Sequence, residues 1–251
     1  MSTISLSPLF LLAALLASAL FAGCASTSPT QTGTLFNTVN DGGTTRPYAV
    51  YVPRNYTPAG EPWPVIIFLN GSGECGTDGQ RQLTQGLYPA MINDPKGWPF
   101  IAVFPQKPET VGLWRKYDPY VMACLKDVQA HYDTDPTRVY LTGLSQGGGG
   151  TWSIASLHPN LFAAIAPICG VRDVQLDTGA LKNVPVWAFH GAKDDVVTPD
   201  TTTKITDAIK AAGGDPKVTI YPDLNHGSWD RTYRDMKLGE WFLEHRRPVA
   251  R

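Results

Sequence analysis

The 251-residue sequence predicts an α/β fold built on a mostly parallel, doubly wound sheet with an antiparallel edge at its N-terminal side. Two observations predict it. Short β-branched runs alternate with longer helical segments between residues 33 and 251. Four of the runs are apolar throughout, which is typical of strands buried on both faces. No linker or internal repeat is visible, so we expect one domain over residues 34–251.

The edge of the sheet comes first. Residues 34–39 and 46–53 are joined by an Asp-Gly-Gly turn that suits a hairpin, and we expect both strands to run antiparallel to the rest. The four buried runs end at Asn70, Pro105, Gly143 and Gly170, and two further strands end at His190 and Pro222. Helices are predicted over residues 117–132, 146–157, 199–212 and 233–246.

The charge balance narrows the possible partners. The chain has 21 Lys and Arg against 22 Asp and Glu, a net charge of -1, with no long run of either sign. Nucleic-acid binding needs a basic surface, so the composition argues against it. A small neutral or weakly charged substrate is the default expectation.

The first residues indicate export. An apolar run from Leu9 to Ala22 is short for a membrane span and stands where a signal peptide sits, so we assign residues 1–23 to a signal. Its end resembles the bacterial lipobox, which makes Cys24 a lipidation site and residues 24–33 a tether. The segment before Leu9 lacks Lys and Arg, and Phe21 replaces the usual aliphatic residue, so secretion without a lipid anchor stays open. Contact with a membrane is expected only through this anchor.

The other cysteines lack the spacing of a zinc site or a redox pair. They are Cys75, Cys124 and Cys169. At most one disulfide can form among three thiols. We expect Cys124 and Cys169 to be small buried residues.

A serine between glycines is the main chemical signal. Gly143-Leu144-Ser145-Gln146-Gly147 follows a predicted strand and precedes a predicted helix, the context of a nucleophile elbow. The chain must turn sharply there, and glycines on both sides of Ser145 avoid a clash. The N-terminus of the helix would stabilise an oxyanion near the hydroxyl.

A nucleophilic serine needs a histidine base that a carboxylate orients. His226 follows the last strand, where a loop can bend over the elbow, and it is our candidate base. Asp194 and Asp195 both follow the strand ending at His190. The chain order and the His-Gly-x-x-Asp spacing favour Asp194, which leaves Asp195 as a cap or surface charge. His190 itself is expected to stabilise a loop.

The oxyanion needs backbone donors. We assign them to the N–H groups of Ser72, in the glycine-rich loop after the first buried strand, and of Gln146. Glu74 lies in the same loop and is expected either to shape the pocket or to form a buried structural pair. The predicted chemistry requires no metal or cofactor.

Together, the segments FLNGSGECGTDG, VYLTGLSQGGGGTW, FHGAKDDVV and NHGSWD resemble an α/β-hydrolase of the esterase group that includes polyhydroxybutyrate-depolymerase-like and phospholipase/carboxylesterase-like proteins. The resemblance spans residues 45–245 and implies a serine carboxylic-ester hydrolase. The substrates of this group range over simple, feruloyl, acetyl-xylan and polyester compounds, so small-molecule and polymeric esters are both expected. Such proteins usually begin the oxyanion loop with His-Gly, where this chain has Asn70-Gly71. We expect altered support of the loop and retained activity.

Two tryptophans are candidates for the substrate wall. Trp114 follows the Pro105 strand and Trp229 follows His226 by three residues, and each has core packing as its alternative role. The segment between the Ala163 and Val184 strands has no room for a lid domain, so the site is expected to be open. A peptidase of the same fold and a non-catalytic binding lipoprotein stay open as alternative functions.

Overall fold

A computed structural model describes residues 31–58, 60–171, 173 and 175–248, which all belong to the unit Gln31–Arg251. The signal at residues 1–23, Cys24 and most of the tether lie outside the described residues. Among the described residues, no helix is both long enough and apolar enough to cross a membrane.

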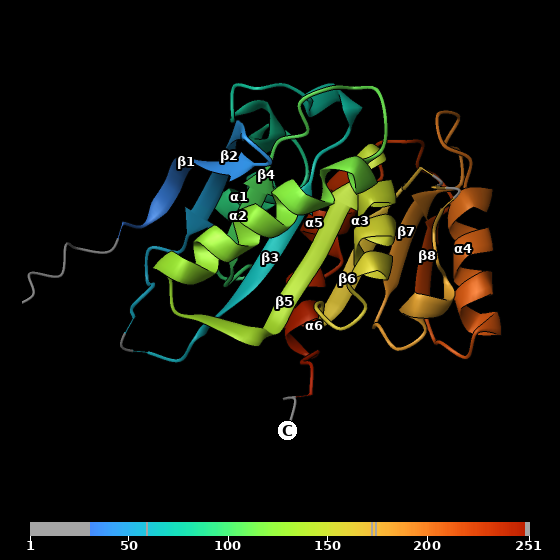
Figure 1. The fold of residues 1–251 in the computed structure, drawn as a ribbon. Helices are drawn as coiled ribbons and strands as arrows, with labels where there is room; N and C mark the ends of the chain where they lie inside the picture. The colour runs from blue at the N-terminus through green and yellow to red at the C-terminus, as the bar shows by residue number, and fades with distance from the viewer. Residues whose placement is uncertain (1–30, 59, 172, 174, 249–251) are drawn as a thin grey trace, which may run out of the picture. The chain divides into compact units, whose positions relative to one another are not determined.

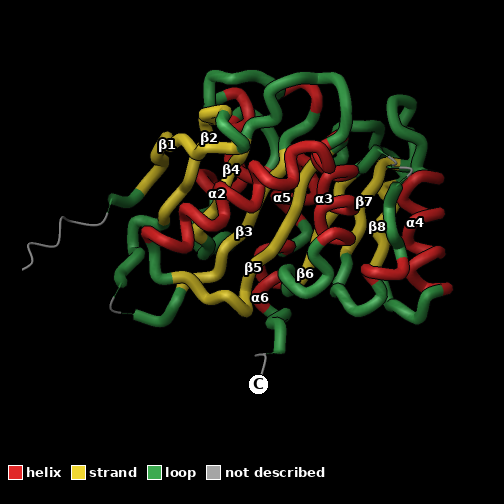
Figure 2. Tube along the Cα trace, in the orientation of Figure 1, coloured by secondary structure: helices red, strands yellow, loops and turns green. Residues whose placement is uncertain are grey.

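Eight strands form one sheet (Figures 1 and 2). In chain order they are β1 (Gly33–Asp41), β2 (Thr44–Val52), β3 (Trp63–Leu69), β4 (Ile101–Pro105), β5 (Thr134–Leu144), β6 (Ala164–Ile168), β7 (Trp187–Gly191) and β8 (Lys217–Tyr221). Their order across the sheet is β1-β2-β4-β3-β5-β6-β7-β8. Within the series β4, β3, β5, β6, β7 and β8, each strand pairs in parallel with its neighbours in the series. The carboxyl ends of these strands therefore lie at one edge of the sheet.

Helices cover both faces of the sheet. They are α1 (Leu87–Asn93), α2 (Asp118–His131), α3 (Gln146–Leu157), α4 (Asp200–Ala211), α5 (Trp229–Asp235) and α6 (Leu238–Leu243). Single 3-10 turns lie at Ser72–Glu74, Arg81–Leu83, Trp114–Tyr117 and Gly179–Leu181. Alternate residues of β3 show the layering: Val65 and Ile67 belong to the core cluster that includes residues of α2, α3 and α4, whereas Ile66 and Phe68 belong to the cluster that includes residues of α1, α5 and α6.

The predicted α/β class is therefore confirmed, and three of the predicted helices are found within one residue of their expected ends. The predicted hairpin is also present. Gly42 and Gly43 make its turn with φ values of 55° and 90°, which glycine adopts without strain.

Three details of the fold differ from the sequence predictions. Strand β2 runs antiparallel to β4, but β1 runs antiparallel to β2 and is therefore parallel to the main sheet. The helix predicted over 233–246 is two short helices, because Lys237 takes a left-handed conformation between α5 and α6. Helix α1 was not predicted: its seven residues, with a proline among them, are too few for a clear helical period.

Candidate active site

Ser145 occupies a strained turn between β5 and α3. Its φ of 54° and ψ of -117° lie in a region that non-glycine residues rarely adopt. Backbone hydrogen bonds hold the turn: the Ser145 N–H donates to the Ile168 carbonyl at 3.0 Å, and its carbonyl accepts from the Gly149 N–H at 3.0 Å. The serine is thus presented at the carboxyl end of a central strand.

The glycines beside Ser145 allow backbone segments to touch. A Cβ at Gly143 would lie 2.5 Å from the Gly147 carbonyl oxygen. A Cβ at Gly147 would lie 1.9 Å from the carbonyl oxygen of Leu69, the last residue of β3. Helix α3 therefore packs its first turn directly on the end of β3, and no side chain fits between them.

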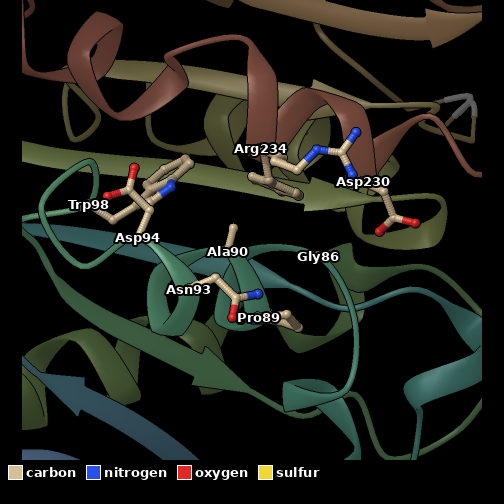
Figure 3. Close-up of a pocket in the computed structure, with 9 residues that line it drawn as sticks. Gly86, Pro89, Ala90, Asn93, Asp94, Trp98, Asp230 and Arg234 are labelled. Atoms are coloured by element: carbon tan, nitrogen blue, oxygen red, sulfur yellow. The ribbon is translucent and has the colours of Figure 1, made fainter.

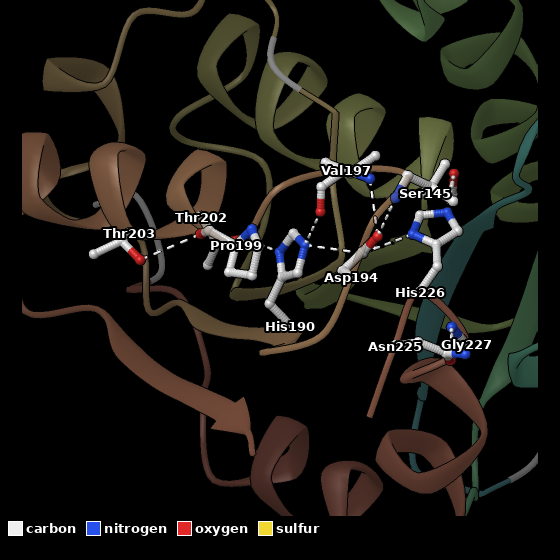
Figure 4. A network of polar contacts seen from close by, with 11 residues as sticks. Ser145, His190, Asp194, Val197, Pro199, Thr202, Thr203, Asn225, His226 and Gly227 are labelled. Atoms are coloured by element: carbon white, nitrogen blue, oxygen red, sulfur yellow. Dashed lines mark hydrogen bonds and ion pairs between the residues drawn. The ribbon is translucent and has the colours of Figure 1, made fainter. Parts of the chain in front are cut away.

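Ser145, His226 and Asp194 form a chain of hydrogen bonds (Figure 4). The Ser145 hydroxyl lies 2.9 Å from His226 Nε2, and His226 Nδ1 lies 2.7 Å from Asp194 Oδ2. A carboxylate only accepts, so Nδ1 carries the proton and Nε2 accepts from the serine. The structure thus brings together the three residues predicted from the sequence, and Asp195 is exposed at the surface.

The loops that carry the acid and the base are tied to each other. The N–H groups of Ala192 and Lys193 donate to the carbonyls of Tyr221 and Leu224, at 2.8 and 2.9 Å. These bonds join the loop after β7 to the loop after β8. Because both loops are anchored to adjacent strands, the distance between the carboxylate and the imidazole is set by the backbone.

Both oxygens of the Asp194 carboxylate accept hydrogen bonds. Its side chain is completely buried, and Oδ1 accepts the N–H groups of Val196 and Val197, each at 2.9 Å. Burial alone would raise the pKa of Asp194, but the hydrogen bonds from His226 and from these two amides outweigh it and lower the pKa. Asp194 therefore keeps its negative charge beside His226 at neutral pH.

Ser72 begins a single 3-10 turn and Gln146 begins helix α3. Each is the first residue of its segment, so its N–H has no acceptor within that helix. The loop holding Ser72 comes close to the nucleophile, since a Cβ at Gly71 would lie 3.5 Å from Ser145 Cβ. This arrangement suits two donors to one developing oxyanion.

Asn70 supports this loop with its side chain. Its Nδ2 donates to the Gly71 carbonyl at 2.7 Å, and its Oδ1 accepts the Lys107 N–H at 3.1 Å. Its own carbonyl accepts the Trp114 indole N–H at 2.9 Å. Asn70 is fully buried, so the residue that replaces the usual histidine still anchors the loop through both polar atoms of its side chain.

The two candidate tryptophans have different roles. Trp114 is fully buried beneath α3, which corrects its placement in the substrate wall in favour of core packing. Trp229 is half-buried, its ring stands edge-on to the His226 ring at 5.5 Å between centroids, and its indole N–H donates to Gln85. Of these two tryptophans, Trp229 alone lies beside the His226 ring. Glu74 is partly exposed and lies against Gly71.

A cavity of about 220 Å³ lies between α1 and α5 (Figure 3). Asp230 and Arg234 of α5 line one side, and Trp98 contributes an aromatic surface. Gly86 lines the other side, and a Cβ there would lie 2.9 Å from Leu144 Cδ2, next to the serine. The residues that line the cavity do not include Ser145, Asp194 or His226.

Cys169 is a neighbour of the triad that the sequence analysis did not place there. Its sulfur, an Asp194 oxygen and a His226 nitrogen lie within 4.8 Å of one another, and among the described residues this is the one group with the spacing of a metal site. Asp194 and His226 already hydrogen-bond to each other. The position of Cys169 after β6, the strand beside β5, was the available signal.

Comparison with known proteins shows the family of the chain. Residues 106–237, more than half of the chain, match the dienelactone hydrolase family. A bifunctional acetylxylan esterase/xylanase of Neocallimastix patriciarum is 30% identical over 168 residues, which cover 64% of this chain and 24% of that protein. The crystal structure of a thermostable esterase superimposes with a TM-score of 0.72 at 30% identity, covering 85% of this chain and 63% of the other.

A ferulic acid esterase of Anaeromyces mucronatus shares the fold, with a TM-score of 0.65 at 14% identity over 82% of this chain and 88% of that one. The chain spans about a quarter of the length of the acetylxylan esterase/xylanase and under two thirds of the thermostable esterase. The fold predicted from the sequence, that of an α/β-hydrolase, is thus confirmed. The match over residues 106–237 shows that the chain belongs to the dienelactone hydrolase family.

Proposed function

We propose that the protein is an exported serine hydrolase of carboxylic esters. The observation that carries this proposal is the unbroken hydrogen-bond chain from Ser145 through His226 to Asp194. The acetylxylan esterase/xylanase and the thermostable esterase that it resembles carry esterase names, which supports the same reaction class. The signal expected at residues 1–23 and the lipobox-like Cys24 support export and a lipid anchor.

The hydrogen-bond geometry supports the following reaction. His226 Nε2 takes the proton of the Ser145 hydroxyl as its oxygen attacks the ester carbonyl. The N–H groups of Ser72 and Gln146 donate to the oxyanion, and the imidazolium then returns the proton to the leaving alcohol. Water, activated by the same imidazole, releases the acyl group and restores the serine. Asp194 holds His226 in the tautomer that these steps need.

The substrates we propose are acetyl or feruloyl esters on a polysaccharide. Relatives named for acetylxylan and for ferulic acid support this class.

The central test compares variants on a short ester such as p-nitrophenyl acetate. Ser145→Ala and Asp194→Asn should each lower kcat by roughly 10⁴-fold or more. The control is Asp195→Asn, a change at the neighbouring exposed residue. Its kcat should stay within about twofold of the native value, because the Asp195 carboxylate is not part of the hydrogen-bond chain from Ser145 to Asp194. Native turnover in Ser145→Ala would disprove the proposed mechanism.

A substrate panel then separates the ester classes. Acetylated xylan, methyl ferulate, long-chain p-nitrophenyl esters, a soluble polyester and peptide amides are compared by kcat/KM. Highest values on the first two support the proposed class. Highest values on peptide amides would instead favour the peptidase alternative.

Export is tested on the full chain by cell fractionation. The native chain should follow the membrane fraction, and Cys24→Ser should release it into a soluble exported fraction. Equal membrane association of both chains would argue against lipidation at Cys24.

A further inference from the structure

A second histidine, His190, contacts the triad carboxylate from the side opposite His226 (Figure 4). His190 Nε2 lies 3.1 Å from Asp194 Oδ2, the same oxygen that accepts from His226. His190 is fully buried at the end of β7, so it cannot reach a substrate. Its role must therefore pass through the residues it touches.

The hydrogen bonds of His190 determine its tautomer. Nε2 lies 2.8 Å from the Val197 carbonyl oxygen, and Nδ1 lies 2.7 Å from the Thr202 hydroxyl. A lone pair on Nε2 would face two oxygens, so Nε2 carries the hydrogen and donates, while Nδ1 accepts from Thr202. The side chain is thereby held at both nitrogens.

Val197 is held from two sides. Its carbonyl accepts from His190, and its N–H donates to Asp194 Oδ1 at 2.9 Å. His190 thus positions the carboxylate twice: indirectly, by fixing the amide that binds Oδ1, and directly, by the contact of its ring edge with Oδ2. Burial lowers the pKa of His190, so the ring is neutral near pH 7 and does not neutralise Asp194.

We infer that His190 is a positioning residue for Asp194, which holds the carboxylate in line with His226 through Val197 and through its own Nε2–H edge. The inference rests on the proposed function, since alignment of Asp194 matters only if His226 acts as the base. A displacement of the Asp194 carboxylate by about 1 Å relative to His226 can lower the rate on the order of 100-fold. Without His190, the two amide donors to Asp194 remain, so we expect a partial loss of kcat.

Three substitutions separate positioning from general stability. His190→Phe keeps a ring of similar size and removes the donor. His190→Gln keeps an N–H donor near the position of Nε2. Thr202→Val keeps the shape of the threonine side chain and removes only its hydrogen bond to Nδ1, on the side of the ring away from Asp194. All three are measured on the full chain with p-nitrophenyl acetate, alongside thermal unfolding.

His190→Phe should lower kcat by about 10- to 100-fold with KM within about twofold. His190→Gln should recover most of that loss, and Thr202→Val should stay within about threefold even where its Tm falls. Titration of each variant with a fluorophosphonate supplies the concentration of active serine, so unfolded protein does not count as lost kcat. A native kcat per active site in His190→Phe overturns the inference, as does a loss in all three variants that simply follows Tm.

Failure of the inference is distinguishable from failure of the proposed function. If Ser145→Ala is inactive and His190→Phe is native in kcat, only the role of His190 is wrong. If Ser145→Ala retains turnover, the proposed reaction itself is wrong, whatever the His190 variants do.

Discussion

Gly147→Ala sets two known effects against each other. Alanine is the better helix former, and at a free helical position the change would stabilise the protein by about 1 kcal/mol. At Gly147, however, the new Cβ would lie 1.9 Å from the Leu69 carbonyl oxygen and 2.8 Å from that of Asn70. Both atoms are backbone, so no side chain can rotate out of the way.

The expected cost in the free energy of unfolding follows from how far the new Cβ falls short of an ordinary contact distance. Ordinary contacts of a Cβ begin at 3.4 Å, so α3 and β3 must separate by roughly 1.5 Å. Overpacking usually costs about 1–3 kcal/mol, and a backbone clash of this size belongs at the upper end. After the gain in helix propensity, we expect a net loss of at least about 2 kcal/mol in the free energy of unfolding. At an m-value of about 2 kcal/mol per M, the urea midpoint falls by about 1 M or more.

We also expect a large loss of activity in the Gly147→Ala protein that remains folded. The same displacement moves Ser145 and Gln146 on one side and the Asn70 loop on the other, so the two proposed oxyanion donors separate. We expect kcat/KM to fall by at least about 100-fold in the folded fraction. The control is Gly179→Ala, in a 3-10 turn where the new Cβ meets only the Asp177 side chain, at 3.3 Å. An unchanged or higher urea midpoint in Gly147→Ala, with rates within a few-fold of native, would refute the close approach of α3 to β3.

Three further outcomes are expected. Asn70→Ala should destabilise the fold by about 1–3 kcal/mol in urea and lower kcat, because the Lys107 N–H is left buried without its acceptor; unchanged kcat would show that the loop holds itself. Burial lowers the pKa of His190 from its ordinary 6.5, so the unfolded chain binds the proton better and stability, followed as the urea midpoint, falls as pH drops below 6.5. That loss should be absent in His190→Gln. Asp194, whose pKa lies below its ordinary 3.8, adds a second loss only as pH falls below that value. Cys75, Cys124 and Cys169 are free and buried, so in the native protein they should react slowly with a chromogenic disulfide reagent. In the unfolded protein all three thiols should react. A fourth thiol would mean that Cys24 is present and unmodified.

The elements and the nucleophile followed from the sequence because they depend on local pattern. Apolar runs of strand length, the glycines of the hairpin turn and the Gly-x-Ser-x-Gly segment each act on neighbouring residues, so their meaning does not require the rest of the chain. The chain order of Ser145, Asp194 and His226 added the candidate triad. The residues that hold this set in place were not visible in that way.

Only the tertiary structure decided which groups meet across the sheet. The choice of Asp194 over Asp195 depends on which carboxylate faces His226, and the burial of Trp114 depends on α3 lying against it. The direction of β1, the break at Lys237 and the contact of His190 with Asp194 likewise arise from segments that pair or pack across the fold. These contacts join residues far apart in the sequence or orient side chains within a folded loop, and local propensity contains no information about them.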